Sequence, residues 1–490
     1  MDEKKELEIV RELCTQLNKD GISYCQWKSN NALDRSATGE NDLDLLVNRA
    51  DLQTFTGILT QLGFKQAFER WRQPLPGIIN YYGFDRDTGR LIHVHAHSQL
   101  ILGHDATKNY RIPIEESYLA SASLNGLFMV PAAEFELIIL VIRLIIKHFT
   151  WDTVVLRQGK LSASEKAEIN FLLKHTSEER LFDVLRNNFE FINIQIFSDC
   201  LKGLTSDFSV WKKIKVAQDL LNCIEPFARF PRGKDIWLKF WHRFYWPFRK
   251  RIQHIDTRKQ MNSGGLMIAI VGGDGAGKTT AIQETYRWLS GVFSIYSFHM
   301  GKPKWSFLTR IIRGILKIGR SLGFYPFARA ENQYTNDPDT LSFPGYPYLI
   351  RAACTARDRY LTYVRARRLA TNGALVILDR FPLSQIKFMD GPHIAYITAN
   401  HPQNRFVKFL IKMEENFYQK MVLPDQLIVL RADPEIAVKR KTEEDEFSVR
   451  ARSSEIWEMD WKQTQASVIN ANKPKEEVSA VIKNLIWSIL

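Results

Sequence analysis

The stretch LMIAIVGGDGAGKTTAIQETYRWL, residues 266–289, constrains the fold of this chain more than any other part of its sequence. It opens with a continuous apolar run, Leu266 to Val271, which is typical of a strand buried in a parallel sheet. A glycine-rich turn follows, and apolar residues then recur at helical spacing. A strand, a turn and a helix in this order predict an α/β domain whose first strand begins at residue 266.

The turn has the spacing of a phosphate-binding loop, Gly-x4-Gly-Lys-Thr. Its glycines allow backbone N–H groups to point inward around an anion, and the helix that follows adds its positive end. In such loops the lysine reaches the β- and γ-phosphates, and the threonine is a ligand of Mg²⁺. We therefore expect ATP and Mg²⁺ as cofactors. The expected nucleotide-binding residues are Gly272, Gly273, Asp274, Gly275, Ala276, Gly277, Lys278, Thr279 and Thr280.

Two later segments also favour phosphate chemistry. The apolar run ALVILDRFPLS ends at Asp379, and an acid at the carboxyl end of a strand faces the same crevice as the loop. Such an acid can hold Mg²⁺, although an Asp at this place can also cap the next turn. The run DQLIVLRAD predicts another strand, with Asp433 as the N-cap of the next helix. The stretch TEEDEFSVRARSSEIW then indicates a charged, mobile flap, and its Arg450 and Arg452 either neutralise a phosphoryl group or form a solvated charge run.

Residues 266–490 resemble a thymidylate kinase, within the nucleoside monophosphate kinases. The blocks GGDGAGKTT, RAACTARDRYLTYVRARRLATNGALVILDRFPLS and PDQLIVLRADPEIAVKR carry the resemblance. It implies a doubly wound parallel sheet with a mobile lid. It also implies that Asp274 lies near the sugar of the acceptor and that Arg359 meets the acceptor phosphate. The residues that it places at the transferring group are Lys278, Asp379, Arg380 and a lid arginine, which is Arg440, Arg450 or Arg452.

One segment departs from that family. Its members have an Arg-Glu-Pro or Arg-Phe-Pro segment after the second strand, where this chain reads FHMGKPKW. We expect Lys302 to contact the acceptor there, and we expect a nucleotide or another phosphorylated or glycan acceptor. The predicted activity is ATP-dependent phosphoryl transfer. Two alternatives stay open: a nucleotide-gated binding protein, and a membrane-peripheral scaffold in glycan assembly, neither of which phosphorylates an acceptor.

A second motif lies near the start of the chain. The run GENDLDLLV places Asp42 and Asp44 at alternate positions of a predicted strand, where two acids can share divalent ions. With WKSN upstream and the strand RLIHVHAHSQL downstream, this part resembles the nucleotidyltransferase fold, which implies an α+β domain. A histidine, His93, takes the place of the usual third carboxylate, so the expected metal ligands are Asp42, Asp44 and His93. His93, His95 and His97 share a face and could instead form a different metal site. An active transferase, a binding-only domain and a structural relic all stay open.

Four regions follow from these patterns: a nucleotidyltransferase-like domain (1–125), a helical extension (126–235), a basic aromatic segment with a linker (236–265), and the kinase-like domain (266–490). The segment from Asp235 interleaves aromatic and basic residues, and so does WSFLTRIIRGILKIGRSLGFYPFAR. The bases of the latter are Arg310, Arg313, Lys317, Arg320 and Arg329, with no acid among them.

The excess of 67 Lys and Arg over 54 Asp and Glu favours anionic partners. For the two basic aromatic segments, interdomain packing and an anionic membrane surface are the favoured interpretations, and nucleic acid is the least favoured. The apolar run LIILVIRLIIKHF contains two bases and spans only 13 residues, so it indicates a buried helix rather than a membrane span. Five scattered cysteines and a charged N-terminus favour a cytoplasmic protein that is at most peripheral at the inner face of a membrane. The oligomeric state is left open.

Overall fold

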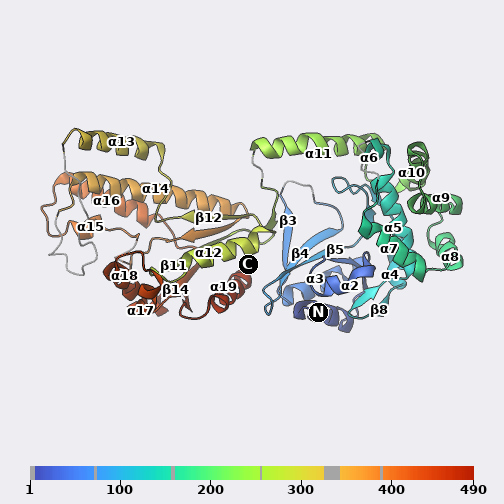
Figure 1. The fold of residues 1–490 in the computed structure, drawn as a ribbon, viewed down its shortest axis with the longest axis horizontal. Coiled ribbons are helices and arrows are strands. Elements are labelled where there is room, and N and C mark those ends of the chain that lie inside the picture. Colours follow the sequence, from blue (N-terminus) through green and yellow to red (C-terminus); the bar gives the residue numbers. More distant parts are fainter. Residues whose placement is uncertain (1–5, 71–73, 156–159, 254–255, 325–342, 387–389) are drawn as a thin grey trace. The chain divides into compact units, whose positions relative to one another are not determined.

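The structure is a computed structural model, which describes the chain apart from residues 1–5, 71–73, 156–159, 254–255, 325–342 and 387–389. The chain divides into two compact units, Met1–Thr257 and Arg258–Leu490 (Figure 1). The division falls inside the basic aromatic segment 236–265 that the sequence predicts. The helical part of that segment belongs to the first unit.

The first unit contains a sheet in which five strands lie in the order β1-β2-β5-β4-β3. Figure 1 labels β3, β4 and β5 of this sheet. β2 and β5 are parallel, with Asp44 opposite His95, and the other neighbours are antiparallel. Alternate residues of β2 and β5, including Leu45 and Val94, pack with helices α1 and α3. Because side chains alternate along a strand, Asp44 and His95 lie on the opposite face. The bounds are α1 (Glu8–Lys19), β1 (Tyr24–Gln26), η1 (Asn30–Ala32), α2 (Leu33–Ala37), β2 (Leu43–Val47), η2 (Arg49–Asp51), α3 (Leu52–Gln61), β3 (Lys65–Glu69), β4 (Ile78–Phe84) and β5 (Leu91–His97).

Helices make up most of the rest of this unit. The apolar run near residue 137 lies in α5, most of whose residues are buried, so the predicted buried helix is confirmed. α5 packs with α7, α8, α9 and α10 in one hydrophobic cluster, which also contains Leu46 of β2 and Trp27, the residue that follows β1. The bounds are β6 (Ile101–Leu102), β7 (Tyr110–Arg111), α4 (Glu115–Ala120), β8 (Ser123–Asn125), β9 (Phe128–Val130), α5 (Ala133–His148), α6 (Trp151–Val155), α7 (Ala163–His175), α8 (Glu178–Asn188), α9 (Ile194–Thr205), α10 (Val210–Ile224), η3 (Glu225–Phe227) and α11 (Arg232–Gln253).

The second unit is built on a sheet of five strands in the order β12-β13-β11-β14-β15. All four neighbouring pairs are parallel, which confirms the predicted parallel sheet. The first strand, β11, lies between β13 and β14, so the chain changes direction across the sheet at this point, where open α/β sheets bind ligands. The strand β10 (Lys259–Met261) comes before this sheet in sequence and is not part of it. The bounds of the five strands are β11 (Leu266–Gly272), β12 (Ile295–His299), β13 (Leu375–Asp379), β14 (Gln426–Arg431) and β15 (Ala466–Asn470).

Helices cover both faces of this sheet. Figure 1 shows α14 and α16 on one side and α12 and α19 on the other. Met267, Ala269 and Val271 of β11 pack with Tyr363 and Ala366 of α14, as the alternation of a buried strand requires. The bounds are α12 (Lys278–Ser290), α13 (Phe307–Ser321), α14 (Tyr346–Thr371), α15 (Ile394–Ile397), α16 (Arg405–Gln419), α17 (Pro434–Arg440), α18 (Glu446–Glu458), η5 (Trp461–Gln463) and α19 (Lys475–Ile489).

The segments around α17 and α18 test two local predictions. Asp433 caps α17 by accepting a hydrogen bond from the backbone of Glu435, as predicted. The stretch that the charge pattern predicts as a charged, mobile flap contains the helix α18, whose N-terminus the Asp445 side chain caps by accepting a hydrogen bond from the backbone of Ser448. The five cysteines are free. Over the residues that the structure describes, none of the helices combines the length and the apolarity that a membrane crossing needs.

Candidate functional site

The loop between β11 and α12 is the core of the candidate site. Gly275 has φ +75°, and a Cβ there would lie 2.5 Å from the carbonyl oxygen of Ala437 in α17. Gly277 has φ +83° and directly precedes α12. These two positions need glycine because of their left-handed backbone and, at Gly275, the close approach of α17. The first N–H groups of α12 have no partner within the helix, so they face the loop as donors for an anion.

Lys278 lies inside this loop. Its Nζ donates hydrogen bonds to the carbonyl oxygens of Gly272 at 2.9 Å and Gly273 at 2.6 Å. Burial, together with the neighbouring Arg380 guanidinium, lowers the pKa of Lys278 to about 8. The ammonium is therefore held by neutral carbonyls where a phosphate oxygen would bind it more strongly.

Asp274 joins the loop to cations from two other segments. Its Oδ1 lies 3.3 Å from Arg380 Nη2 and 3.9 Å from Lys278 Nζ, and its Oδ2 lies 2.5 Å from Arg452 Nη1. The carboxylate is only 3% exposed. Three cations thus share one buried carboxylate, which leaves an excess of positive charge beside the phosphate-binding loop.

Asp379 and Arg380 follow at the carboxyl end of β13, where Asp379 is opposite Ile270 of β11. Within the described part of the chain, Oδ1 of Asp379 is buried and has no hydrogen-bond partner. Arg380 has φ +57°, a left-handed conformation that is costly for a residue with a side chain and is concentrated at functional sites. With the exposed Thr279, Asp379 offers the oxygen ligands that Mg²⁺ prefers, so these residues fit the predicted ion.

The three candidate lid arginines have different surroundings. Arg452 of α18 reaches Asp274, whereas Arg450, two residues earlier, is paired with Glu435 and Glu446 at the surface. Arg440 donates a hydrogen bond to the carbonyl oxygen of Ala471 at 2.9 Å. It also lines a cavity of about 290 Å³ beside the loop, whose other lining residues include Gly275, Gly277, Thr280, Lys475 and Ile482. The structure therefore brings Arg452 to the loop and leaves Arg450 away from it.

Arg359 is buried and fully engaged by the protein. Its guanidinium donates to the carbonyl oxygens of Met300 and Gly301, to the backbone and side chain of Asp390, and to the Tyr418 hydroxyl. These five bonds equal the five N–H donors of an arginine. In this arrangement Arg359 holds the loop after β12 in place, so its predicted contact with an acceptor phosphate would require one of these bonds to open. Sequence reasoning missed Asp390 and Tyr418, which lie in no motif.

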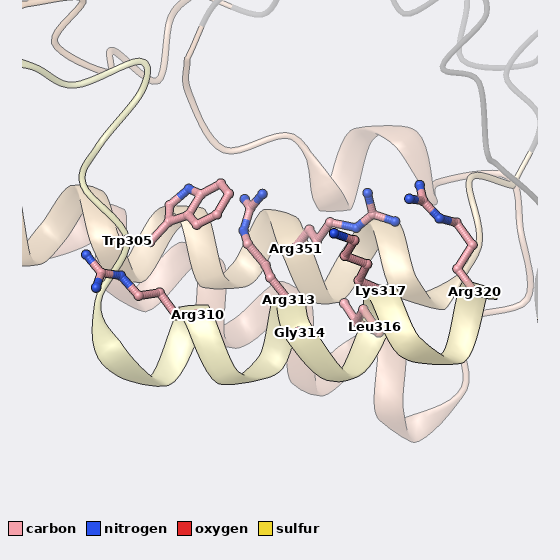
Figure 2. Close-up of a pocket in the computed structure, with 8 residues that line it drawn as sticks. All are labelled: Trp305, Arg310, Arg313, Gly314, Leu316, Lys317, Arg320 and Arg351. Carbon is pink, nitrogen blue, oxygen red and sulfur yellow. The ribbon is translucent and has the colours of Figure 1, made fainter. Parts of the chain in front are cut away.

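A basic pocket runs along α13 (Figure 2). The exposed Lys302 lies in the loop that precedes this helix in sequence. Its volume is about 460 Å³. Arg313 stacks over the Trp305 ring at 4.4 Å and donates to Thr355 of α14. Burial, with Arg351 nearby, lowers the pKa of Arg313. The residues that line the pocket include no acid and are Trp305, Arg310, Arg313, Gly314, Leu316, Lys317, Arg320 and Arg351.

The same helix exposes an apolar face. Phe307 is 79% exposed, Ile315 63% and Leu322 66%, and the bases of the helix are interleaved with these residues. The helical part of this basic aromatic segment ends at Ser321. Arg329, the last base that the sequence pattern includes, lies outside the described residues.

The first unit holds a second charged cluster. Lys28 Nζ lies 2.9 Å from Asp44 Oδ1, and His95 Nδ1 lies 3.1 Å from the same oxygen. Burial would raise the pKa of Asp44, but the hydrogen bond to His95 and the charge of Lys28 outweigh it, and the pKa is lowered. Burial lowers the pKa of Lys28, and it lowers the pKa of His97 well below the ordinary range.

The predicted metal ligands of this unit are divided between two places. His93 Nδ1 lies 3.0 Å from Asp42 Oδ2, and His93 Nε2 lies 2.9 Å from Asn80 Oδ1. Within the described residues, the group whose ligand atoms lie close together is Asp44, His95 and His97. The structure therefore groups Asp44 with the two later histidines rather than with Asp42 and His93. The register of β2 against β5 brings Asp44, His95 and His97 together, and this register cannot be read from the sequence.

No protein-family model matches the chain. The chain is 27% identical over 228 residues to the uncharacterized ATP-binding protein YghR of Escherichia coli strain K12, and equally to that of E. coli O6:H1. Each alignment covers 45% of this chain and 87% of the relative. Among solved structures, deoxyadenosine kinase from M. mycoides with bound dATP matches with a TM-score of 0.28 and 18% identity, over 45% of this chain and 98% of that chain. Part of the chain is thus similar to a protein described as binding ATP.

Proposed function

We propose that the second unit is an ATP-dependent phosphotransferase of the nucleoside monophosphate kinase type. The observation that carries this proposal is the convergence of Lys278, Arg380 and Arg452 on the single buried carboxylate of Asp274, beside a glycine loop at the carboxyl edge of a parallel sheet. The similarity to a protein described as binding ATP supports it. Three preorganised cations can neutralise a phosphoryl group in transfer without any reorganisation of solvent.

Each residue then has a role in catalysis by positioning and charge. Lys278 exchanges the carbonyls of Gly272 and Gly273 for phosphate oxygens, and Arg380 and Arg452 hold the transferring group. Thr279 and Asp379 would hold Mg²⁺, which supplies charge neutralisation at the phosphates when bound. The cavity of about 290 Å³ beside the loop receives the nucleoside part of ATP, with Arg440 at its wall.

For the acceptor we propose a phosphorylated or glycan-bearing molecule that reaches the basic pocket of α13 (Figure 2). Arg351 of that pocket precedes Arg359 by eight residues on α14, which is about 12 Å along the helix axis. An acceptor long enough to span this distance would contact both the pocket and the loop of Lys302.

The exposed apolar face of α13, with its interleaved bases, favours peripheral binding to an anionic membrane surface. Vesicles that contain anionic phosphatidylglycerol should carry the protein upward in a flotation gradient, and neutral phosphatidylcholine vesicles should not. Ile315→Ser/Ile318→Ser should lose flotation, whereas Ser321→Ala, at the end of the same helix, should retain it. No flotation with either lipid removes this part of the proposal.

The test of the activity is a screen with γ-labelled ATP and Mg²⁺ against nucleoside monophosphates, sugar phosphates and lipid-linked sugars. The proposal predicts a labelled product with at least one acceptor class. ATP consumption that never depends on an acceptor would instead identify a nucleotide-gated binding protein. Failure of labelled ATP to bind at all would favour a scaffold without a working nucleotide site.

For the first unit we propose a nucleotidyltransferase-like domain that binds a phosphate-bearing ligand. The support is a cavity of about 570 Å³ that includes Lys28, Lys108 and Arg143 among its lining residues, and to which α11 contributes Lys239 and Arg243. Nucleoside triphosphates should raise the unfolding temperature of this unit in wild type, and Arg143→Ala should reduce the rise. An unchanged unfolding temperature with every triphosphate would contradict the proposal.

A further inference from the structure

Asp44, His95 and His97 bring three metal-ligand atoms together in the first unit. One oxygen of Asp44 and one nitrogen of each histidine all lie within 4.8 Å of one another. His95 Nδ1 is 3.1 Å from Asp44 Oδ1 and 3.2 Å from His97 Nε2. The three residues lie on paired strands, with Asp44 opposite His95, and the edge of the Trp27 ring packs against His97. The cluster therefore has a rigid support.

Two of these three separations match those of ligands around one small cation, and the third, between Asp44 and His97, is at most 4.8 Å. In a tetrahedral zinc site with metal–ligand bonds of about 2.0–2.1 Å, neighbouring ligand atoms are about 3.3 Å apart, since the edge of a tetrahedron is about 1.6 times the bond. The separation of 3.1 Å between Asp44 and His95 and that of 3.2 Å between His95 and His97 are close to that value.

Lys28 Nζ already lies 2.9 Å from Asp44 Oδ1, but hydrogen bonds among Asp44, His95 and His97 do not satisfy the atoms that these three residues turn toward one another. A neutral imidazole carries one proton on its two nitrogens. If Nδ1 of His95 holds a proton, Asp44 and Nε2 of His97 compete for the same hydrogen. If Nε2 of His97 donates to His95 instead, the lone pairs of His95 Nδ1 and Asp44 Oδ1 face each other at 3.1 Å. A cation would accept a lone pair from all three atoms at once.

The ligand types indicate which cation. Two imidazoles and one carboxylate favour zinc and its divalent transition-metal neighbours, whereas Mg²⁺ prefers a set of oxygens. Three protein ligands also leave a fourth position open. Lys28, which contacts Asp44, also lines the cavity of about 570 Å³ in this unit, so an anionic ligand bound in that cavity would lie next to the cluster.

We propose that Asp44, His95 and His97 form a binding site for a divalent transition metal of the zinc type. This site is independent of the phosphotransferase of the second unit. It differs from the metal site that the sequence predicts, whose expected ligands are Asp42, Asp44 and His93, because Asp42 and His93 lie outside it.

The test uses the full-length protein, stripped with a chelator, dialysed and titrated with Zn²⁺ and with Co²⁺. We expect one tightly held metal per chain by elemental analysis, and an intense visible Co²⁺ spectrum of the kind that tetrahedral sites give. His97→Ala and His95→Ala should each weaken Zn²⁺ binding at least about 100-fold, because loss of a ligand exceeds the 10- to 100-fold effect of losing a supporting partner.

Matched controls are His93→Ala and Asp42→Asn, which should keep both the metal and the spectrum. The wild-type Co²⁺ spectrum needs no variant, so the proposal stays testable if a histidine variant fails to fold. Two results would overturn it: wild type that retains no metal at micromolar Zn²⁺, or controls that lose as much affinity as His97→Ala.

Discussion

Each unit of this protein places a lysine of lowered pKa beside a buried aspartate, but the two sites are built differently. Lys278 is buried in its own loop and donates to two carbonyls of that loop. Lys28 keeps a quarter of its side chain exposed and bonds to Asp44 of another strand. In both places a non-glycine residue has positive φ: Ser29 directly follows Lys28 in the first unit, and Arg380 contacts Asp274 in the second.

The turn of Lys28 also depends on helices that are distant in sequence. The backbone N–H of Ser29 donates to Glu168 of α7, and that of Asn30 donates to Glu136 of α5. The comparison teaches that a site built by one contiguous loop can be found from its spacing alone. A site built by strand register and supporting helices cannot.

The largest expected effect separates the two lysines. Lys278→Ala should reduce phosphoryl transfer by at least about 10³-fold, because the main cation at the β- and γ-phosphates is lost. Lys28→Ala should leave the same rate within about twofold, since we assign it to a separate site. Initial rates with γ-labelled ATP measure both, with exposed Lys462→Ala as a surface control. Equal losses in the two lysine variants would contradict the assignment of separate sites.

The second prediction concerns the support of the Lys28 turn. Burial raises the pKa of Glu136 to about 7. Between pH 4.5 and 7 the folded state therefore binds more protons at this group than the unfolded state, and stability falls as the pH rises. The loss is on the order of 3 kcal/mol above pH 7, at about 1.4 kcal/mol per pKa unit.

Glu136→Gln, which cannot ionise, should be more stable than wild type at pH 8 and equal to it at pH 4.5. Urea unfolding followed by circular dichroism gives the free energy of unfolding of each protein. The second unit is the same in both proteins, so its contribution cancels in the difference. The same difference at both pH values would show that the carboxyl group does not titrate in the folded state.

The third prediction uses two arginines on one helix. Arg452→Ala should reduce the rate of phosphoryl transfer about 100-fold, the effect of removing one preorganised donor from a site of developing charge. Arg450→Ala should change it less than about twofold, because its partners are exposed carboxylates. The kcat values of the two variants measure the contrast. A larger loss in Arg450→Ala would mean that α18 rotates before transfer.

The smallest effect is a pH dependence. The pKa of Lys278 is lowered to about 8, so its ammonium is lost in the free protein as the pH rises above 8. Affinity for ATP should then fall by up to about tenfold per pH unit. Titration with a fluorescent ATP analogue from pH 7 to 9.5 measures this. Lys278→Arg stays charged over this range, so it should bind the analogue more weakly but with an affinity that does not change with pH. If the affinity of both proteins falls with pH, another group is responsible for the titration.

Much of the second unit could be predicted because its signals are local. The strand, loop and helix around Gly272–Thr280 follow from neighbouring residues, and Asp379 follows from its place at a strand end. The choice of Arg452 over Arg450 could not be predicted, because it depends on how α18 packs over the loop. The hydrogen bonds that hold Arg359 could not be predicted either, because its partners Asp390 and Tyr418 lie in no motif.

In the first unit the sequence indicated the acids and the histidines but not their grouping. Alternation placed His93, His95 and His97 on one face, yet only the register of β5 against β2 decides which of them meets Asp44. The supporting carboxylates Glu136 and Glu168 come from helices more than 100 residues away, a distance that no local pattern spans.

The most direct test of the central claim is a structure of the protein with Mg²⁺ and a non-hydrolysable ATP analogue. The account predicts that Nζ of Lys278 leaves the carbonyls of Gly272 and Gly273 and lies within hydrogen-bond distance of the β- and γ-phosphates, with Arg452 beside them. A bound analogue whose phosphates lie elsewhere, while Lys278 keeps both carbonyl bonds, would contradict it.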